Sequence, residues 1–180
     1  DIYTGKQKTL PFPIYTISPD GRTALSVDFE RINDLMPGYG YAGIPDPNHH
    51  VLAPEDAGIY RCDLETGKRE LIISIARMNR MPLKESDDPS FQDFYTRKNW
   101  FNHLLFNTDG SRFVFLHRWK SLSKSNVGGF GTLMYSSDPG GKDIRLVDGS
   151  GYTSHFIWRD AEHLAIWTRY RGEDGFFLFR

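Results

Sequence analysis

The sequence predicts an all-β protein built from four-stranded antiparallel blades of the β-propeller type. Three observations support this prediction. Two strand–turn–strand patterns alternate along the chain, glycine follows a polar residue at most of the turns, and no segment sustains the 3.6-residue hydrophobic period of a helix. Short strands that recur at regular spacing between turn residues are typical of sandwiches, barrels and propellers.

The first pattern is a short apolar strand, a tight polar turn, and a second strand rich in β-branched and aromatic residues. Its copies span residues 14–27, 102–116 and 154–167. Asp20-Gly21 and Asp109-Gly110 provide the positive φ angles that a tight hairpin turn requires. The third copy has Asp160-Ala161 instead, so we expect its turn to differ in detail.

The second pattern is another strand–turn–strand segment, and it follows the first pattern along the chain. Its copies span residues 60–73, 134–147 and the start of the chain, residues 1–10. Two consecutive hairpins make four antiparallel strands, which is one propeller blade. The predicted organisation is therefore the end of a blade (1–10), a blade (11–74), a second blade (101–148) and the start of a third (152–180).

Two complete and two incomplete blades are too few for a closed ring, which usually has four to eight blades. Open blades would leave bare strand edges. We therefore expect this chain to be part of a larger ring, and the missing blades of the same propeller to be its first partner.

Composition narrows the classes of function. The chain has 22 basic and 23 acidic residues, so no basic field indicates a nucleic-acid partner. No run approaches the roughly 18 consecutive apolar residues that a membrane span needs. The single cysteine, Cys62, excludes an internal disulfide framework.

Three long insertions interrupt the repeats. About thirty residues separate Val27 from Ile59, a second insertion spans residues 75–100, and a Ser/Gly-rich one spans residues 120–130. In an up-and-down blade these connections fall on the same face, so we expect them around one mouth of the central channel. Loops of this length usually bind, cover or regulate something. The alternative is that they are decorative or serve oligomerisation.

The histidines follow the repeats. His103 and His155 each precede an inner-strand aromatic, Phe106 or Trp158, by three residues, so they occupy equivalent positions. His117 ends the next strand, and antiparallel pairing returns it to the same rim. We therefore expect three imidazoles at the channel mouth, where they would titrate near neutrality or bind a metal. The alternative is that each only hydrogen-bonds a neighbouring blade.

Basic and aromatic residues accompany these histidines. The guanidinium of Arg118 matches a carboxylate or sulfate bidentately. Tyr39, Tyr41 and Trp119 have rings suited to stacking on sugar faces. We treat these four as candidate substrate-binding residues, although arginine and tryptophan are also ordinary structural residues of blades.

Residues 102–107, 115–119 and 154–158 resemble the oligogalacturonate lyase family of seven-bladed propellers, which degrade short uronic-acid chains. They share the family's order: a histidine opens an inner strand, a second closes the next strand, and a third precedes an aromatic residue. The similarity covers roughly the second half of the chain. The first half, with its Pro-Gly-Tyr-Gly-Tyr insertion at residues 37–41, is more similar to uncharacterised bacterial propeller proteins.

The resemblance implies a β-elimination, in which a base removes the proton next to a uronate carboxylate, cations neutralise that carboxylate, and the glycosidic oxygen leaves. It implies that His155 binds a divalent metal such as manganese, with further ligands from later blades. It also implies that His103 and His117 face the substrate as acid, base or orienting groups. The sequence departs from the family after His117, where Arg118-Trp119 replaces an acidic-glycine run.

The favoured hypothesis is a carbohydrate-active propeller, a lyase whose partner is an acidic oligosaccharide. The alternative is a non-catalytic propeller that binds a protein or glycan through its loop-rich face. A hydrolase would need two catalytic carboxylates, for which Asp87-Asp88 and Glu55-Asp56 are candidates. The compartment is left open between bacterial periplasm and cytoplasm, with the periplasm favoured.

Overall fold

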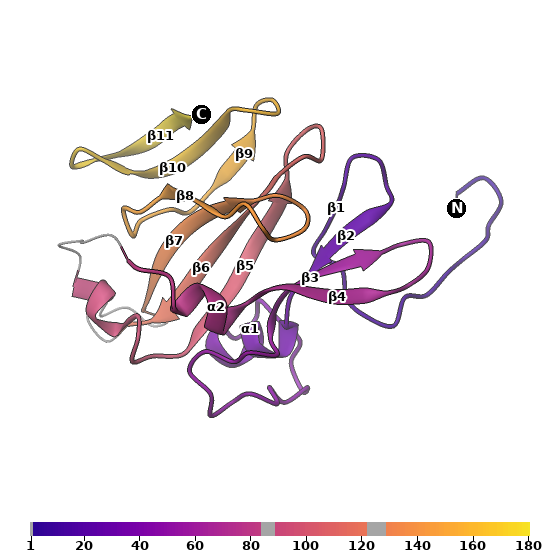
Figure 1. Ribbon diagram of the computed structural model, residues 1–180, viewed down its shortest axis with the longest axis horizontal. Coiled ribbons are helices and arrows are strands. Elements are labelled where there is room, and N and C mark those ends of the chain that lie inside the picture. The colour runs from indigo at the N-terminus through magenta and orange to yellow at the C-terminus, as the bar shows by residue number, and fades with distance from the viewer. Residues whose placement is uncertain (1, 84–88, 122–128) are drawn as a thin grey trace.

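The computed structural model describes residues 2–83, 89–121 and 129–180, which form mainly antiparallel β-strands (Figure 1). The first sheet contains β1 (Thr16–Ile17), β2 (Thr23–Ser26), β3 (Gly58–Asp63) and β4 (Arg69–Ser74). The second contains β5 (Asn99–Phe106), β6 (Phe113–Lys120), β7 (Phe130–Ser137) and β8 (Arg145–Asp148). The third contains β9 (Phe156–Trp158), β10 (Leu164–Tyr170) and β11 (Glu173–Phe179). In every sheet, strands adjacent in the chain are adjacent in space, which confirms the expected antiparallel sheets of three or four strands.

The turns follow the expected chemistry. Gly21 and Gly110 have φ angles of +71° and +76°, in the left-handed region where a residue with a Cβ is strained. In all three turns an aspartate Oδ1 accepts the backbone N–H two residues ahead, at 3.1 Å for Asp20, 2.9 Å for Asp109 and 2.9 Å for Asp160. The third turn differs in detail, because Asp160 Oδ1 also accepts the N–H of His163 at 2.8 Å and no residue of this turn has a positive φ.

The N-terminal segment differs from its predicted strand–turn–strand structure. Residues 2–10 contain a turn but no strand among the described positions, and they extend away from the sheets (Figure 1). The side chain of Lys8 reaches the backbone oxygens of Leu64 and Glu65 at 2.9 and 2.6 Å. A hairpin on its own is marginally stable, and no strand of the described sheets lies alongside this segment to pair with it.

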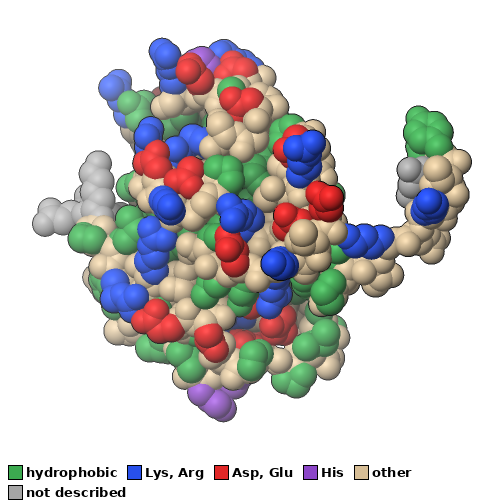
Figure 2. Space-filling view, turned by 45° about the vertical axis from the view of Figure 1, so that its right-hand side comes forward, with side chains coloured by type: hydrophobic (Ala, Val, Ile, Leu, Met, Phe, Trp, Pro, Cys, Tyr) green, Lys and Arg blue, Asp and Glu red, His purple; other side chains and the backbone are tan. Residues whose placement is uncertain are grey.

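The insertions contain short helices that the sequence did not predict. Helix α1 spans Phe29–Leu35, α2 spans Ile75–Asn79, and the 3₁₀-helix η1 spans Pro89–Asp93. None exceeds seven residues, so none is long enough to display a helical period in the sequence. Within the described ranges, no helix has both the length and the apolar character needed to cross a bilayer. Basic and acidic side chains are interleaved over the face shown in Figure 2.

The middle sheet is buried on both faces. Phe113 and Phe115 of β6 point into the main core between this sheet and the first one. Val114 and Leu116 point the other way and pack against Ile166 and other apolar residues of the third sheet. Successive residues of a strand face opposite sides, so β6 supplies both cores with alternate side chains.

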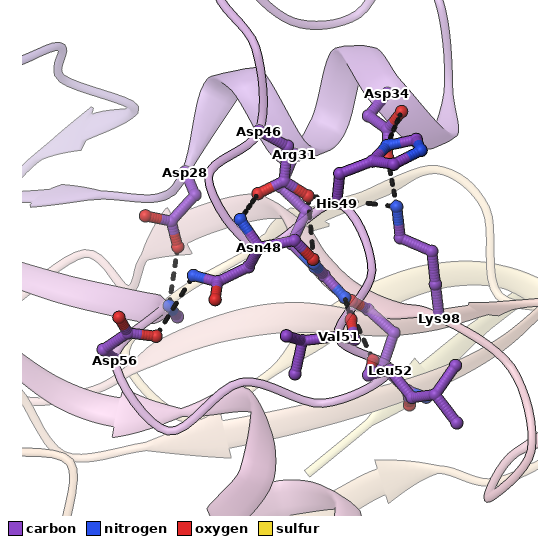
Figure 3. A network of polar contacts seen from close by, with 12 residues as sticks. Asp28, Arg31, Asp34, Asp46, Asn48, His49, Val51, Leu52, Asp56 and Lys98 are labelled. Carbon is purple, nitrogen blue, oxygen red and sulfur yellow. Dashed lines mark hydrogen bonds and ion pairs between the residues drawn. The ribbon is translucent and has the colours of Figure 1, made fainter.

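A buried guanidinium holds the first insertion in place (Figure 3). Arg31 lies in α1 and is 1% exposed. It donates to the carboxylate of Asp46 at 3.0 Å and to the backbone oxygens of Asn99 (2.7 Å), Asn48 (3.1 Å), Val51 (2.9 Å) and Leu52 (3.0 Å). One side chain therefore joins the helix, the loop that follows it and the first residue of β5.

Two further contacts support this arrangement. Asp34 of α1 forms an ion pair with Lys98 (Figure 3). Asp34 Oδ1 also lies 2.9 Å from His49 Nδ1, within hydrogen-bond distance. Asp28, at the start of α1, accepts the backbone N–H of Gly58 at 2.6 Å. Burial raises the pKa of Asp28 to about 6. Both ends of the insertion are thus fastened to the sheets.

We predict that Arg31→Met lowers the free energy of unfolding by about 3–5 kcal/mol, because it leaves the carboxylate of Asp46 buried without its cation. Urea unfolding followed by fluorescence would measure the change. Arg80→Met is the matched control, because Arg80 forms an ion pair with Glu55 on the surface and such pairs contribute little. Equal midpoints for the two variants would contradict the role assigned to Arg31.

Candidate functional site

A cavity of about 870 Å³ lies beside the middle sheet, where the first insertion, β5, β6 and the segment before β9 meet. Its wall includes the side chains of Tyr15, Met36, Tyr39, His103, Arg118 and Lys120. His155 also lines it. Among the described residues, no aspartate or glutamate lines this cavity. Its charged wall is therefore basic, although the chain as a whole is nearly neutral.

A β-bulge turns His103 into the cavity. In β5, Phe101 belongs to the main core, and a regular strand would return the side chain of His103 to that same face. The pairing of β5 with β6 shifts between Asn102 and Leu105, and Leu104 takes the next core position. His103 itself has a φ of +53°, an uncommon conformation in which histidine is among the favoured residues. Such bulges re-aim side chains next to functional sites.

The hydroxyl of Tyr15 supports the bulge from the first sheet. It accepts the backbone N–H of His103 at 2.9 Å, a group that the bulge removes from the strand ladder. The ring of Tyr15 stacks on Phe29 with centroids 5.7 Å apart, and Phe29 stacks on Tyr41 at 4.9 Å. This aromatic stack joins the first insertion to the cavity wall.

The imidazole of His103 is neutral at physiological pH. Burial, together with the nearby charges of Arg118 and His155, lowers its pKa to about 4. A neutral imidazole has one unprotonated nitrogen, which is a prerequisite for a general base. A bound anion would favour the protonated form, so the pKa of His103 is expected to rise when one is present.

Arg118 is a buried cation with no anionic partner among the described residues. Its side chain is 5% exposed and lies over the ring of Phe130, with 4.5 Å from Cζ to the ring centroid. Its Nε has no hydrogen-bond partner within the described ranges. Burial lowers its pKa to about 10, so the guanidinium remains charged at neutral pH. A buried charge without a counter-ion is costly, and it indicates a site for an external anion.

The sulfur of Met36 faces two buried donors. Arg118 Nη1 approaches Met36 Sδ to 3.7 Å, and Asn102 Nδ2 approaches it to 3.9 Å. Asn102 is 2% exposed, and its Oδ1 has no partner in the part of the chain that the structure describes. A thioether is a weak acceptor. The two donors therefore lie close together without a strong acceptor between them.

His155 lines the cavity with its ring exposed, and its Nδ1 lies 2.7 Å from the hydroxyl of Ser154. The described residues contain no group of three histidine, cysteine, aspartate or glutamate side chains that could hold a metal ion. Because the resemblance implies that the further ligands of His155 come from later blades, the metal site at His155 stays a prediction. His49 contacts Asp34, and its ring lies against that of His50 with centroids 4.7 Å apart.

The expected convergence of three imidazoles requires a correction at His117. This side chain is fully buried, and its Nε2 donates to Asn99 Oδ1 at 2.7 Å. Its ring packs against Phe94 and Phe101 at 5.1 and 5.0 Å, and burial lowers its pKa to about 3. His117 and Arg118 are neighbours in β6 and face opposite sides, so only Arg118 reaches the cavity.

Two of the predicted sugar-stacking residues also lie elsewhere. Trp119 is fully buried, and its Nε1 donates to the backbone oxygen of Ser90 at 2.6 Å. A Cβ on Gly131 would approach this indole to 2.1 Å, so a glycine is needed opposite it. Tyr41 stacks on Phe29 and does not line the cavity. Of the predicted stacking residues, Tyr39 alone lines it.

Of the carboxylates considered for a hydrolase, the described pair, Glu55 and Asp56, does not line the cavity. Glu55 forms an ion pair with Arg80, and Asp56 accepts a hydrogen bond from Asn48 at 3.1 Å. Asp87 and Asp88 lie outside the described residues. The first and third insertions both contribute to the cavity, through residues 35–39 and through Lys120 and Phe130 at the two ends of the third.

Sequence reasoning missed Tyr15, Met36 and Asn102. Tyr15 lies just before a strand, as many structural aromatic residues of blades do, so its position gave no signal. Met36 lies in the first insertion, which has no counterpart in the other repeats. A signal existed for Asn102, because it adjoins His103 and lies in the segment that carries the family resemblance.

Comparisons with known proteins give no assignment. No protein-family model matches the chain, and no curated protein matches it significantly.

We predict that Tyr15→Phe lowers the free energy of unfolding by about 1 kcal/mol and accelerates hydrogen exchange of the His103 amide, because that N–H loses its acceptor. Exchange measured by NMR would locate the effect. Tyr41→Phe is the control, since the Tyr41 ring belongs to the same stack but its hydroxyl bonds no described residue. Unchanged exchange at His103 in Tyr15→Phe would contradict the positioning role.

Proposed function

We propose that the three sheets are successive blades of a β-propeller, seven-bladed as the family resemblance implies, with its missing blades as first partner. The up-and-down strand order and the stacking of the middle sheet between two cores support this proposal. So does the recurrence of the same turn chemistry at Gly21 and Gly110.

We propose further that the cavity binds an acidic oligosaccharide and that the protein is a lyase for uronic-acid chains. One observation carries the binding proposal: Arg118 is a buried cation, without a counter-ion among the described residues, in the wall of a cavity that no described carboxylate lines. A uronate carboxylate supplies the missing charge, and charge-assisted hydrogen bonds to a guanidinium are strong. Lys120 and Tyr39 border the same space and suit the remaining sugar surface.

The chemistry proposed is a β-elimination. Arg118 neutralises the carboxylate, which lowers the cost of building negative charge on the carbon beside it. The neutral imidazole of His103 accepts the proton from that carbon, and the electron pair left behind forms the double bond as the glycosidic oxygen departs. His103 then returns the proton to that oxygen. The base and the carboxylate-binding cation must contact the same sugar unit, and His103 and Arg118 line one cavity.

A second candidate is a non-catalytic propeller that binds acidic glycans in the same cavity. The observation in its favour is the same buried cation: Arg118 in a cavity that no described carboxylate lines binds an anion without any catalytic step. Both candidates require Arg118, but only the lyase forms an unsaturated product.

We predict that Arg118→Met weakens binding of tri-galacturonate at least tenfold, because it removes the cation that the carboxylate contacts. Calorimetry at low salt would measure the affinity. The variant should keep or raise the unfolding midpoint, because it replaces an unpaired buried charge with an apolar side chain.

Arg159→Met is the matched control. It removes the same charge from an exposed position outside the cavity, where Arg159 pairs with Asp160. Equal affinity in the Arg118 and Arg159 variants would contradict the binding site.

We predict that the lyase releases an unsaturated product, detected by ultraviolet absorbance, and that His103→Ala abolishes this release while leaving binding within threefold. Because His103 must be unprotonated, kcat/KM falls as the pH drops through about 4, the pKa of its free form. In the complex the bound carboxylate raises this pKa, so kcat falls at a higher pH than kcat/KM does. Product release undiminished in His103→Ala would exclude His103 as the base, and binding without product in the unaltered protein would favour the second candidate.

A further inference from the structure

Two buried N–H donors, of which Arg118 lies in the cavity wall, point at a weak acceptor, the thioether of Met36. Arg118 Nη1 lies 3.7 Å and Asn102 Nδ2 lies 3.9 Å from Met36 Sδ. Buried donors normally have oxygen or nitrogen acceptors, and leaving them poorly satisfied costs free energy. An oxygen atom attached to this sulfur would lie beside both donors.

Met36 is also the methionine that the cavity exposes. It is half-buried, lies at the end of α1 and lines the cavity. Met78 and Met134 are fully buried. Met81 is half-buried and packs against the main core, as Met36 does, but it does not line the cavity. Oxidation of methionine follows exposure of the sulfur, so a reagent that enters the cavity reaches Met36.

We propose that Met36 is an oxidation site that closes the anion-binding cavity. A hydroperoxide transfers one oxygen atom to the sulfur: the O–O bond breaks, an S–O bond forms, the thioether loses two electrons, and the peroxide leaves as water or an alcohol. The product is a sulfoxide, whose oxygen is a strong acceptor on a chain that was apolar before. That oxygen accepts the hydrogen bonds of Arg118 Nη1 and Asn102 Nδ2.

This inference rests on the proposed function for its consequence at the site. The sulfoxide oxygen takes the position at Arg118 that a uronate oxygen would occupy, so the oxidised protein no longer binds the acidic ligand. Reduction by a methionine sulfoxide reductase restores the thioether and reopens the site. The chain therefore carries a reversible switch that responds to peroxide.

The experiment compares two variants that each retain one half-buried methionine. Met81→Leu leaves Met36 as the reactive residue, and Met36→Leu leaves Met81; leucine conserves the volume in both. Each protein is treated with hydrogen peroxide, and peptide mass spectrometry measures sulfoxide formation at each position. We expect Met36 to oxidise faster than Met81.

Thermal unfolding tests the hydrogen bonds without any ligand. Oxidation of Met81 places a polar group against the core and should lower Tm by about 2–4 °C for each kcal/mol lost. Oxidation of Met36 should leave Tm unchanged or raise it, because the new oxygen satisfies two donors. A fall in Tm on Met36 oxidation equal to that of Met81 overturns the inference.

Calorimetry with tri-galacturonate then tests closure. Oxidised Met81→Leu should bind at least tenfold more weakly than its untreated form, and the reductase should restore the affinity, whereas oxidised Met36→Leu should bind unchanged. If the untreated protein does not bind tri-galacturonate, the proposed function fails. The Tm comparison then still tests whether the sulfoxide oxygen accepts hydrogen bonds from Arg118 and Asn102. If oxidised Met81→Leu binds as tightly as before, the switch is excluded while the binding site stands.

Discussion

The cavity depends on the buried guanidinium of Arg31. An insertion of about thirty residues has few strands of its own to hold it, and its backbone oxygens need partners where they are buried. Arg31 donates to three of them and pairs with the carboxylate of Asp46, while its Nε fixes α1 to the start of β5. This places Met36 and Tyr39, just beyond the helix, against the wall formed by β5 and β6. Without this anchor the insertion would not be held where it borders the site.

Arg31 and Arg118 are both buried arginines, and the contrast between them distinguishes a structural role from a functional one. The first has its hydrogen bonds directed at five acceptors, one of them charged. The second contacts a phenyl ring and a sulfur atom, and its Nε has no described partner. A buried cation without a counter-ion destabilises the folded chain, so stability does not explain why Arg118 is there. A bound anion would recover this free energy, and for this reason we propose Arg118 as the place of the ligand.

The sequence predicted part of the candidate site, and the errors have a common cause. His103 and His155 were expected at one channel mouth, and the structure places both in the wall of one cavity with Arg118 and Tyr39, while the roles of these residues stay predictions. His117 was expected to join them because its position along the strand was considered without the face on which it lies. Phe113, Phe115 and His117 are every second residue of β6, so all three face the main core, and this spacing is visible in the sequence. For His103 the same rule would have given the wrong face, because an unforeseen bulge reverses it.

The sequence by itself determined the antiparallel sheets and their turns, because alternating apolar residues and glycines with positive φ are local requirements that each segment meets alone. It also determined which residue types were available for an anion site. Only the tertiary structure decided which of them meet. The bulge at His103, the hydroxyl of Tyr15 beneath it and the meeting of Met36 with Asn102 and Arg118 all join segments that are far apart in the chain. Contacts of this kind arise from packing between sheets and insertions, which no local pattern of residues encodes.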